Sequence, residues 1–147
     1  MKRLGILLVC FAALAMTSCS MFEAASSSNA MANTTGKNAG VAVQGLYGAY
    51  KRTGTIDLTN TTNLNNALSL AAAYSNLKQN KNNAEYRKAF TTGLIASSAG
   101  LITSSNATAF VDKLLASSGL SNVNVQNVTQ TAATVAAIVS LLNVLRQ

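Results

Sequence analysis

The sequence contains no histidine, no tryptophan and no proline, and only 10% of its 147 residues are charged. Without histidine the chain lacks the commonest general base and the commonest metal ligand, which excludes Ser-His-Asp triads and most zinc sites. Because charged residues are so few, Ser, Thr and Asn must supply most of the polar surface. These absences favour a protein that binds or supports other molecules over one that catalyses a reaction.

Carboxylates are also scarce, with only four acidic residues in the chain. Three of them, Asp57, Glu85 and Asp112, lie in the part predicted to fold, and each is isolated in sequence. An enzyme would need these three to converge in a cleft, since a catalytic carboxyl pair lies about 5–10 Å apart. Glu85 is better explained as a helix-start residue and the other two as surface charges. We therefore expect no enzyme, no cofactor and no metal site.

The N-terminal residues have the three-part order of a secretory signal peptide. Lys2 and Arg3 precede the apolar run "LGILLVCFAALA" (4–15), and a short segment of mostly small residues follows at 16–18. Twelve apolar residues form a helix of about 18 Å, whereas the hydrocarbon core of a bilayer is roughly 30 Å thick. We therefore predict that residues 1–18 are a cleaved export signal and not a membrane-spanning helix.

The four residues "MTSC" (16–19) resemble the lipobox of bacterial lipoproteins, in which small residues precede a cysteine that becomes the first residue of the mature chain. Met16 stands where that motif most often has Leu. The resemblance covers residues 1–20 only. It implies a diacylglycerol on the Cys19 thiol and a further acyl chain, such as palmitate, on its amino group. A thiolate is a strong nucleophile for such a transfer.

The lipoprotein resemblance also bears on location. In many Gram-negative bacteria an Asp after the cysteine retains lipoproteins in the inner membrane, and this chain has Ser20 there, which favours the outer membrane. Some Bacteroidota lipoproteins carry an acidic run just after the cysteine that directs them to the cell surface. Here Glu23 is the only acidic residue nearby, so the comparison favours the periplasmic face over the cell surface. The alternative is ordinary cleavage after Ala15, which would leave Cys19 as a free thiol. Cys10 would be removed with the signal in either case.

Residues 20–39 are rich in Ser, Asn, Thr and Ala and show no sustained apolar periodicity. This composition predicts that the lipidated cysteine and a flexible tether occupy residues 19–39, with a reach of about 25 Å. The folded domain is then expected at 40–147.

Apolar residues recur at helical spacing throughout the domain, and no alternating strand pattern competes. The expected fold class is therefore all-α, a small bundle of about five helices behind a flexible N-terminal tether. Asn82, followed by Glu85 three residues later, predicts a capping box at the start of the third helix. The expected helices lie at about 39–54, 60–80, 82–101, 107–118 and 124–146.

Two groups of small residues predict close packing between helices. Gly93, Ser97 and Gly100 lie near one another on the third helix, and Gly45, Gly48 and Ala49 are similarly spaced on the first. Because such faces also occur in membrane helices, membrane contact or oligomerisation through residues 39–50 remains an alternative.

The last helix is apolar on nearly all sides over residues 132–145, which predicts the central helix of the bundle. At about 21 Å this segment is too short to span a membrane alone. Docking into a groove or self-association is the alternative for it.

The densest positive charge lies at residues 78–88, where Lys78, Lys81, Arg87 and Lys88 could contact lipid phosphates or an acidic partner. The alternative is that these side chains only solvate two helix ends. Removing Lys2 and Arg3 leaves nine basic residues against four acidic ones, a scattered net charge of +5. Such a distribution does not predict nucleic-acid binding.

The sequence as a whole predicts a non-enzymatic envelope lipoprotein that binds or scaffolds another envelope component. Its expected partners are a membrane, through the N-terminal lipid, and an unidentified envelope protein; its oligomeric state is open. The alternative is a lipid-anchored carrier that holds a small apolar ligand in a cavity between the second, third and fifth helices. A scaffold predicts a filled core and an exposed apolar patch instead.

Overall fold

The computed structural model describes the backbone of residues 2–123 and 131–146, and the side chains from Ser28 onward except Asn122, 124–131 and Gln147. Within these ranges every regular element is helical, which confirms the predicted all-α bundle. The predicted signal peptide and Cys19 lie outside the described side chains. The elements are α1 (Lys2–Thr53), α2 (Thr61–Gln79), α3 (Ala84–Ser97), α4 (Ala107–Ala116), α5 (Thr131–Leu142) and the short 3-10 helices η1 (Ser118–Asn122) and η3 (Asn143–Arg146).

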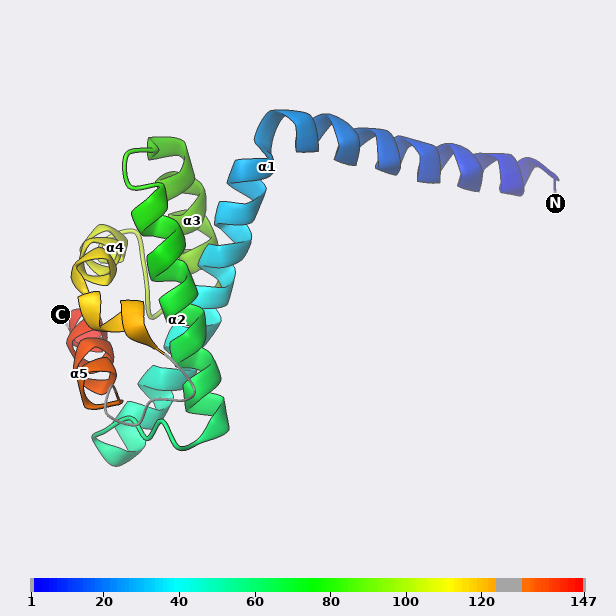
Figure 1. Cartoon of the computed structure of the whole chain (residues 1–147). Coiled ribbons are helices and arrows are strands. Elements are labelled where there is room, and N and C mark those ends of the chain that lie inside the picture. Colours follow the sequence, from blue (N-terminus) through cyan, green and yellow to red (C-terminus); the bar gives the residue numbers. More distant parts are fainter. Residues whose placement is uncertain (1, 124–130, 147) are drawn as a thin grey trace.

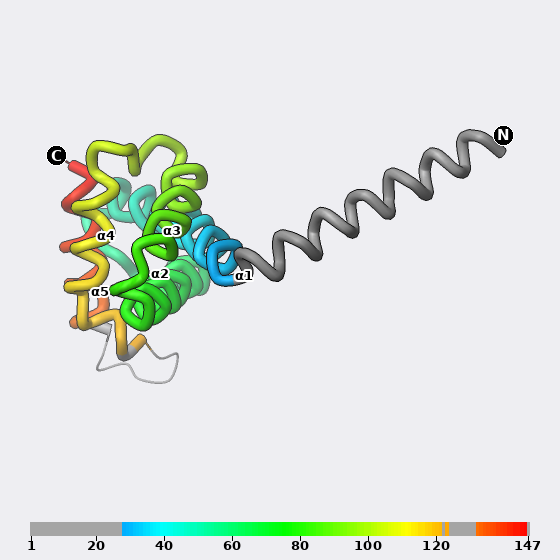
Figure 2. Tube along the Cα trace, turned by 90° about the horizontal axis from the view of Figure 1, so that it is seen from above, coloured from blue at the N-terminus to red at the C-terminus, as the bar shows by residue number. Residues whose placement is uncertain are grey.

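The bundle is built around the described part of α1, which packs against both α2 and α3. In two views at right angles, α2 and α3 lie between α1 and the pair formed by α4 and α5 (Figures 1 and 2). The residues that α1 buries are mostly small, and Leu46 is the largest of them. Because small side chains keep helix axes close together, one helix can contact two neighbours along much of its length.

The predicted tether is wrong for residues 28–39, which belong to the bundle. Ala32 and Ala39 are fully buried, and Gly36 between them is buried as well. A scan for Leu, Ile, Val or Phe misses this segment because its inward-facing residues are alanine and glycine. The folded domain therefore includes residue 28 instead of beginning at 40.

The prediction that residues 132–145 form the central helix is also wrong. Ala132, Ala133 and Ala136 of α5 are exposed, and only one face of the segment reaches the core. Alanine raises the apolar content of a segment, yet each exposed methyl group leaves little apolar area in water. An alanine-rich helix can therefore lie at the edge of a bundle. The fully buried residues of this segment are Ile138, Leu141 and Leu142.

The core is filled mainly by Leu, Ile, Phe and Ala. On α2, Leu70, Tyr74 and Leu77 belong to the buried face, whereas Leu64 and Leu68 are half-buried. The largest fully buried side chains are Phe90, Phe110, Leu46, Leu70, Leu77, Leu94, Ile102, Leu114, Leu120, Ile138, Leu141 and Leu142.

Asparagine side chains cap two helices. Asn60 Oδ1 accepts hydrogen bonds from the backbone N–H groups of Thr62 (3.0 Å) and Asn63 (3.2 Å) at the start of α2. At the start of α3, Asn83 Oδ1 accepts from Tyr86 N at 3.0 Å. The predicted cap, Asn82, is thus wrong by one residue, because Asn83 is the residue whose extended backbone precedes the first helical turn.

Candidate functional site: the basic end of the bundle

Direct backbone contact between α1 and α3 fixes the geometry of the candidate site. A Cβ atom on Gly93 of α3 would lie 3.0 Å from Lys37 N and still closer to the Asn33 carbonyl oxygen. A Cβ on Gly36 of α1 would meet the Phe90 carbonyl oxygen in the same way. These glycines allow an approach that no larger residue permits.

Polar side chains add hydrogen bonds across the same interface. Asn33 Nδ2 donates to Ala89 O at 3.3 Å, and Gln44 Nε2 donates to Ser97 O at 2.6 Å. Ser97 Oγ lies 2.7 Å from Lys37 O and 2.8 Å from Gly93 O, so its single proton is shared between two carbonyls. The two helices are therefore held in one register.

The small residues predicted from the sequence divide into two groups. Gly93 and Ser97 make the close approach to α1, and a Cβ on Gly45 would meet the side chain of Asn66 on α2. Gly100 and Gly48, in contrast, have almost no neighbour where a Cβ would be. Gly36 and Gly40, in the predicted tether, also make close contacts that the sequence pattern did not predict. Their four-residue spacing, matched by Gly93 and Ser97, was the signal that could have identified them.

The start of the described part of α1 lies beside the start of α3. Asn29, Ala30 and Asn33 of α1 line an open cleft of about 710 Å³ together with Glu85 and Lys88, among others, of α3. The turn between α2 and α3 is consequently at the same end of the bundle as the start of the described part of α1 (Figure 1). We call residues 28–30 and 78–88 the basic end.

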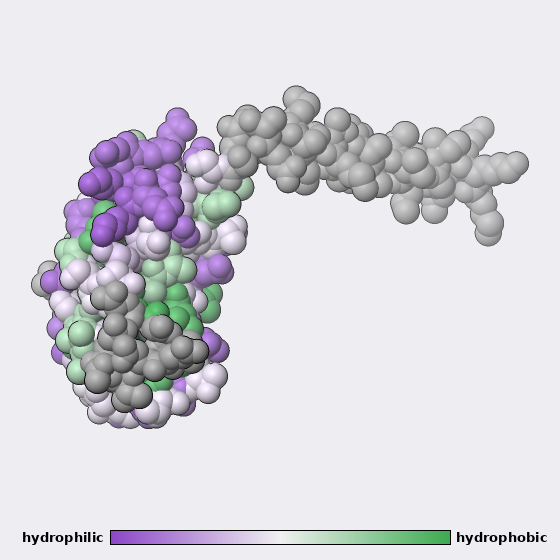
Figure 3. All heavy atoms as spheres, viewed as in Figure 1, coloured by the Kyte–Doolittle hydropathy of each residue, from purple (hydrophilic) through white to green (hydrophobic). Residues whose placement is uncertain are grey.

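Three of the four predicted basic residues are exposed at this end: Lys78, Lys81 and Lys88. Lys78 Nζ lies 5.6 Å from the centroid of the Tyr74 ring, which orients its ammonium group without neutralising it. Hydrophilic residues gather at this end of the molecule (Figure 3). The turn itself is hollowed by a shallow depression of about 550 Å³, lined by residues 78–85.

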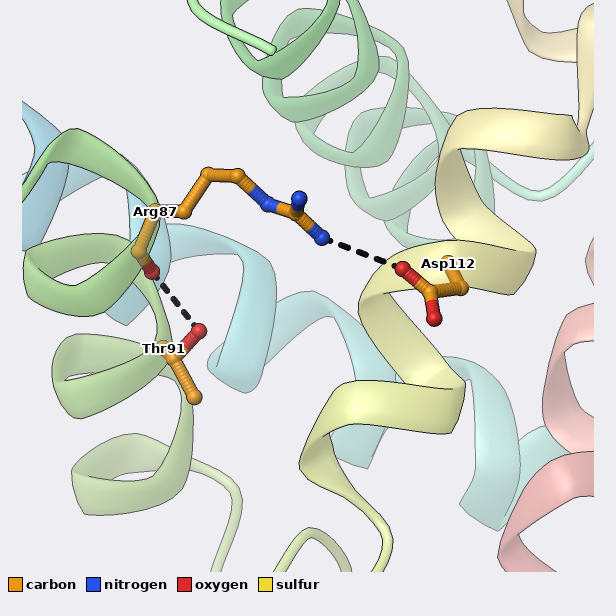
Figure 4. A network of polar contacts seen from close by, with 3 residues as sticks. All are labelled: Arg87, Thr91 and Asp112. Atoms are coloured by element: carbon orange, nitrogen blue, oxygen red, sulfur yellow. Dashed lines mark hydrogen bonds and ion pairs between the residues drawn. The ribbon is translucent and has the colours of Figure 1, made fainter. Parts of the chain in front are cut away.

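Arg87 is arranged differently from the three lysines. Its Nη2 atom lies 3.1 Å from Oδ1 of Asp112 on α4, and its carbonyl oxygen accepts a hydrogen bond from Thr91 Oγ1 at 2.7 Å (Figure 4). The guanidinium group therefore points along the side of the bundle toward α4. With Arg87 balanced by Asp112, three lysines against Glu85 give the basic end a net charge of +2.

The carboxylates do not gather at one place in the described structure. Asp57 and Glu85 lie at opposite ends of α2, whose 19 residues span roughly 28 Å. Asp57 Oδ1 accepts hydrogen bonds from Thr59 Oγ1 at 2.6 Å and Thr59 N at 2.9 Å, and these bonds hold the pKa of Asp57 below its ordinary value. In the described residues no three side chains of the metal-ligating types lie together.

The clefts lined by described residues are open grooves at the surface. A groove of about 380 Å³ between α2 and η1 is lined partly by Lys78, Gln79 and Ser121. Among the described side chains, the large apolar ones that are exposed are Met31 (63%) and Val41 (58%), and they lie ten residues apart on α1. The exposed apolar patch expected of a scaffold is therefore not found among the described side chains.

Comparisons with models of protein families, with curated proteins and with solved structures found no match. Over the part of the chain that the structure covers, none of the helices is both long and apolar enough to cross a membrane.

Proposed function

We propose that this protein is a non-enzymatic lipoprotein of the bacterial envelope, anchored through lipid on Cys19, that acts as a binding or scaffold module for another envelope component. The observation that carries the proposal is the order of Lys2 and Arg3, the apolar run at 4–15 and the lipobox-like "MTSC". Several acyl chains, at about 0.8 kcal/mol per buried methylene, would hold a domain of this size firmly on a membrane. Ser20 favours the outer membrane, and the scarcity of acidic residues after Cys19 favours its periplasmic face.

The arrangement of the described domain supports a role in binding. Its core is filled by large buried side chains, and its backbone-to-backbone contact between α1 and α3 makes a stiff platform. The described side chains do not form the exposed apolar patch expected of a scaffold, so binding would rely on polar and charged groups. Asp57 and Glu85 lie too far apart for a catalytic carboxyl pair.

The carrier alternative requires an apolar cavity between α2, α3 and α5. The clefts found among the described residues are instead open and carry polar or charged side chains along their walls. We therefore prefer the binding or scaffold function.

The anchor can be tested with two cysteine substitutions made in the full-length chain and expressed in a bacterial host that attaches such lipids. Cys19→Ala removes the attachment atom, and we expect the protein to leave the membrane fraction or to remain as an uncleaved precursor. Cys10→Ala is the matched control, because it removes the other cysteine of the sequence and leaves the lipobox unchanged. Equal membrane association of the Cys19→Ala and wild-type proteins, with normal cleavage, would rule out the lipid anchor.

The binding function is tested separately by in-cell photocrosslinking from two exposed positions, Val41 on α1 and Lys81 in the turn after α2. We expect at least one position to give a discrete adduct that disappears with Cys19→Ala, because only the anchored protein meets its partner. A wild-type protein that gives no adduct from either position would argue against a scaffold.

A further inference from the structure

Resting on the proposed lipid anchor, we propose that the basic end of the bundle docks on anionic phospholipid headgroups of the membrane that holds the anchor. Lys78, Lys81 and Lys88 would make the contact. The anchor would then fix the orientation of the domain as well as its location.

The first argument is the short distance along the chain between the anchor and the folded domain. Nine residue steps separate Cys19 from Ser28, which amounts to about 14 Å if helical and at most about 30 Å if extended. Residues 28–39, which the sequence predicted to belong to a tether of about twenty residues, are part of the bundle. The anchor therefore keeps the Ser28 end of α1 close to the headgroups.

The second argument is that the lysines lie at this end. The cleft shared by Asn29, Ala30 and Lys88 places the start of α3 next to the start of the described part of α1. Lys51 and Arg52 lie near the other end of α1, roughly 35 Å further along the helix axis. The long axis of the bundle would have to lie parallel to the membrane for these two residues to reach the headgroups. The basic end reaches the headgroups without such a tilt.

The third argument is that the charges at the basic end are available to phosphates. Lys78, Lys81 and Lys88 are exposed, and the ion pair recorded among the described side chains is that of Arg87 with Asp112. Glu85 is the opposing charge at this end.

The test uses chains that begin at Cys19, because this residue is then the only cysteine, and the described core, from Ala32 to Leu142, is complete. Each chain is coupled through Cys19 to a maleimide-bearing lipid in preformed vesicles. The protein has no tryptophan, so a single reporter can be introduced. Asn82→Trp marks the basic end and Thr55→Trp marks the far end; both native side chains are exposed. Energy transfer to dansyl-labelled headgroups then reports which end lies near the lipid.

We expect transfer from the Asn82→Trp reporter to be stronger in vesicles of phosphatidylcholine with phosphatidylglycerol than in phosphatidylcholine alone, and transfer from Thr55→Trp to stay weak in both. Each lysine near an anionic surface strengthens association about fivefold. Lys81→Gln with Lys88→Gln should therefore lower the ratio of docked to free domain about thirtyfold. Lys51→Gln with Arg52→Gln is the matched control, which also removes two positive charges and should leave the ratio unchanged.

Transfer from Asn82→Trp that does not depend on lipid charge would overturn the proposal and leave an acidic protein as the ligand of these lysines. An equal loss of docking in both double variants would overturn it as well, because the contact would then depend on net charge alone. Chemical coupling replaces the host's lipid attachment. The experiment can therefore fail while the anchor at Cys19 is real, and the Cys19→Ala experiment can fail while the basic end still binds anionic vesicles.

Discussion

Replacing Gly93 with alanine tests the close contact of α1 and α3 that determines where the basic end lies. The new Cβ would lie 3.0 Å from Lys37 N and nearer still to the Asn33 carbonyl oxygen. Both obstacles are backbone atoms, which cannot rotate away as a flexible side chain can. The two helices must therefore separate, and the hydrogen bonds of Asn33 to Ala89 and of Gln44 to the α3 backbone would lengthen.

The expected magnitude combines two opposing effects. Overpacking a close interface lowers the free energy of unfolding by about 1–3 kcal/mol. Replacing glycine with alanine inside a helix raises it by about 1 kcal/mol. We expect Gly93→Ala to lower the free energy of unfolding by up to about 2 kcal/mol, because the gain offsets only the smallest overpacking costs. Gly48→Ala is the matched control on α1, because its Cβ would meet only the end of the Arg52 side chain at 4.0 Å. That variant should be more stable than wild type by about 0.5–1 kcal/mol.

Both variants can be compared in chains beginning at Cys19 by urea unfolding followed with far-ultraviolet circular dichroism. The all-helical fold gives a strong signal, and 1 kcal/mol corresponds to about 3–5 °C in a parallel thermal experiment. If Gly93→Ala were as stable as Gly48→Ala, the backbones of α1 and α3 would not touch as described, and the position of the basic end would lose its support.

Three further predictions concern the loops and caps. Ala99 has φ +50° just after α3, so Ala99→Gly should raise the urea midpoint by relieving up to about 1 kcal/mol of strain; an unchanged or lower midpoint would contradict this strain. Asn83→Ala should lower the free energy of unfolding by about 1 kcal/mol through loss of the α3 cap, whereas Asn82→Ala should lower it little. The reverse order in the same assay would support the capping box at Asn82 that the sequence predicts. The hydroxyl and N–H of Thr59 lower the pKa of Asp57. Their stabilising contribution is therefore present above about pH 4 and is lost as the pH falls through the lowered pKa of Asp57 in the folded protein. Asp57→Asn should lack that part of the acid dependence in unfolding experiments from pH 6 to pH 2, and an unaltered profile would rule out this contribution.

The sequence predicts the helices best where large apolar residues mark the buried face. Phe90 and Leu94 on α3, and Phe110 and Leu114 on α4, recur at helical spacing and are all buried. The pattern fails where alanine and glycine form the contact surface, as at residues 28–39. Small residues show no contrast between a buried and a solvated face, so only tertiary contacts reveal that this segment packs against α3.

The candidate site was predictable only in part, for a similar reason. Lys78, Lys81 and Lys88 lie close in sequence on either side of one turn, so their grouping needed no tertiary information. The pairing of Arg87 with Asp112 joins residues 25 positions apart on different helices, and the proximity of Asn29 to Lys88 joins α1 to α3. Both depend on how the helices pack, which local periodicity does not specify.

The most direct test of the account is the intact mass of the protein extracted from membranes of its native host. The account predicts a chain that begins at Cys19 and carries the added mass of a diacylglyceryl group and a further acyl chain. A chain cleaved near Ala15 with an unmodified Cys19 thiol would contradict it, because the domain would then have no anchor to hold its basic end against a membrane.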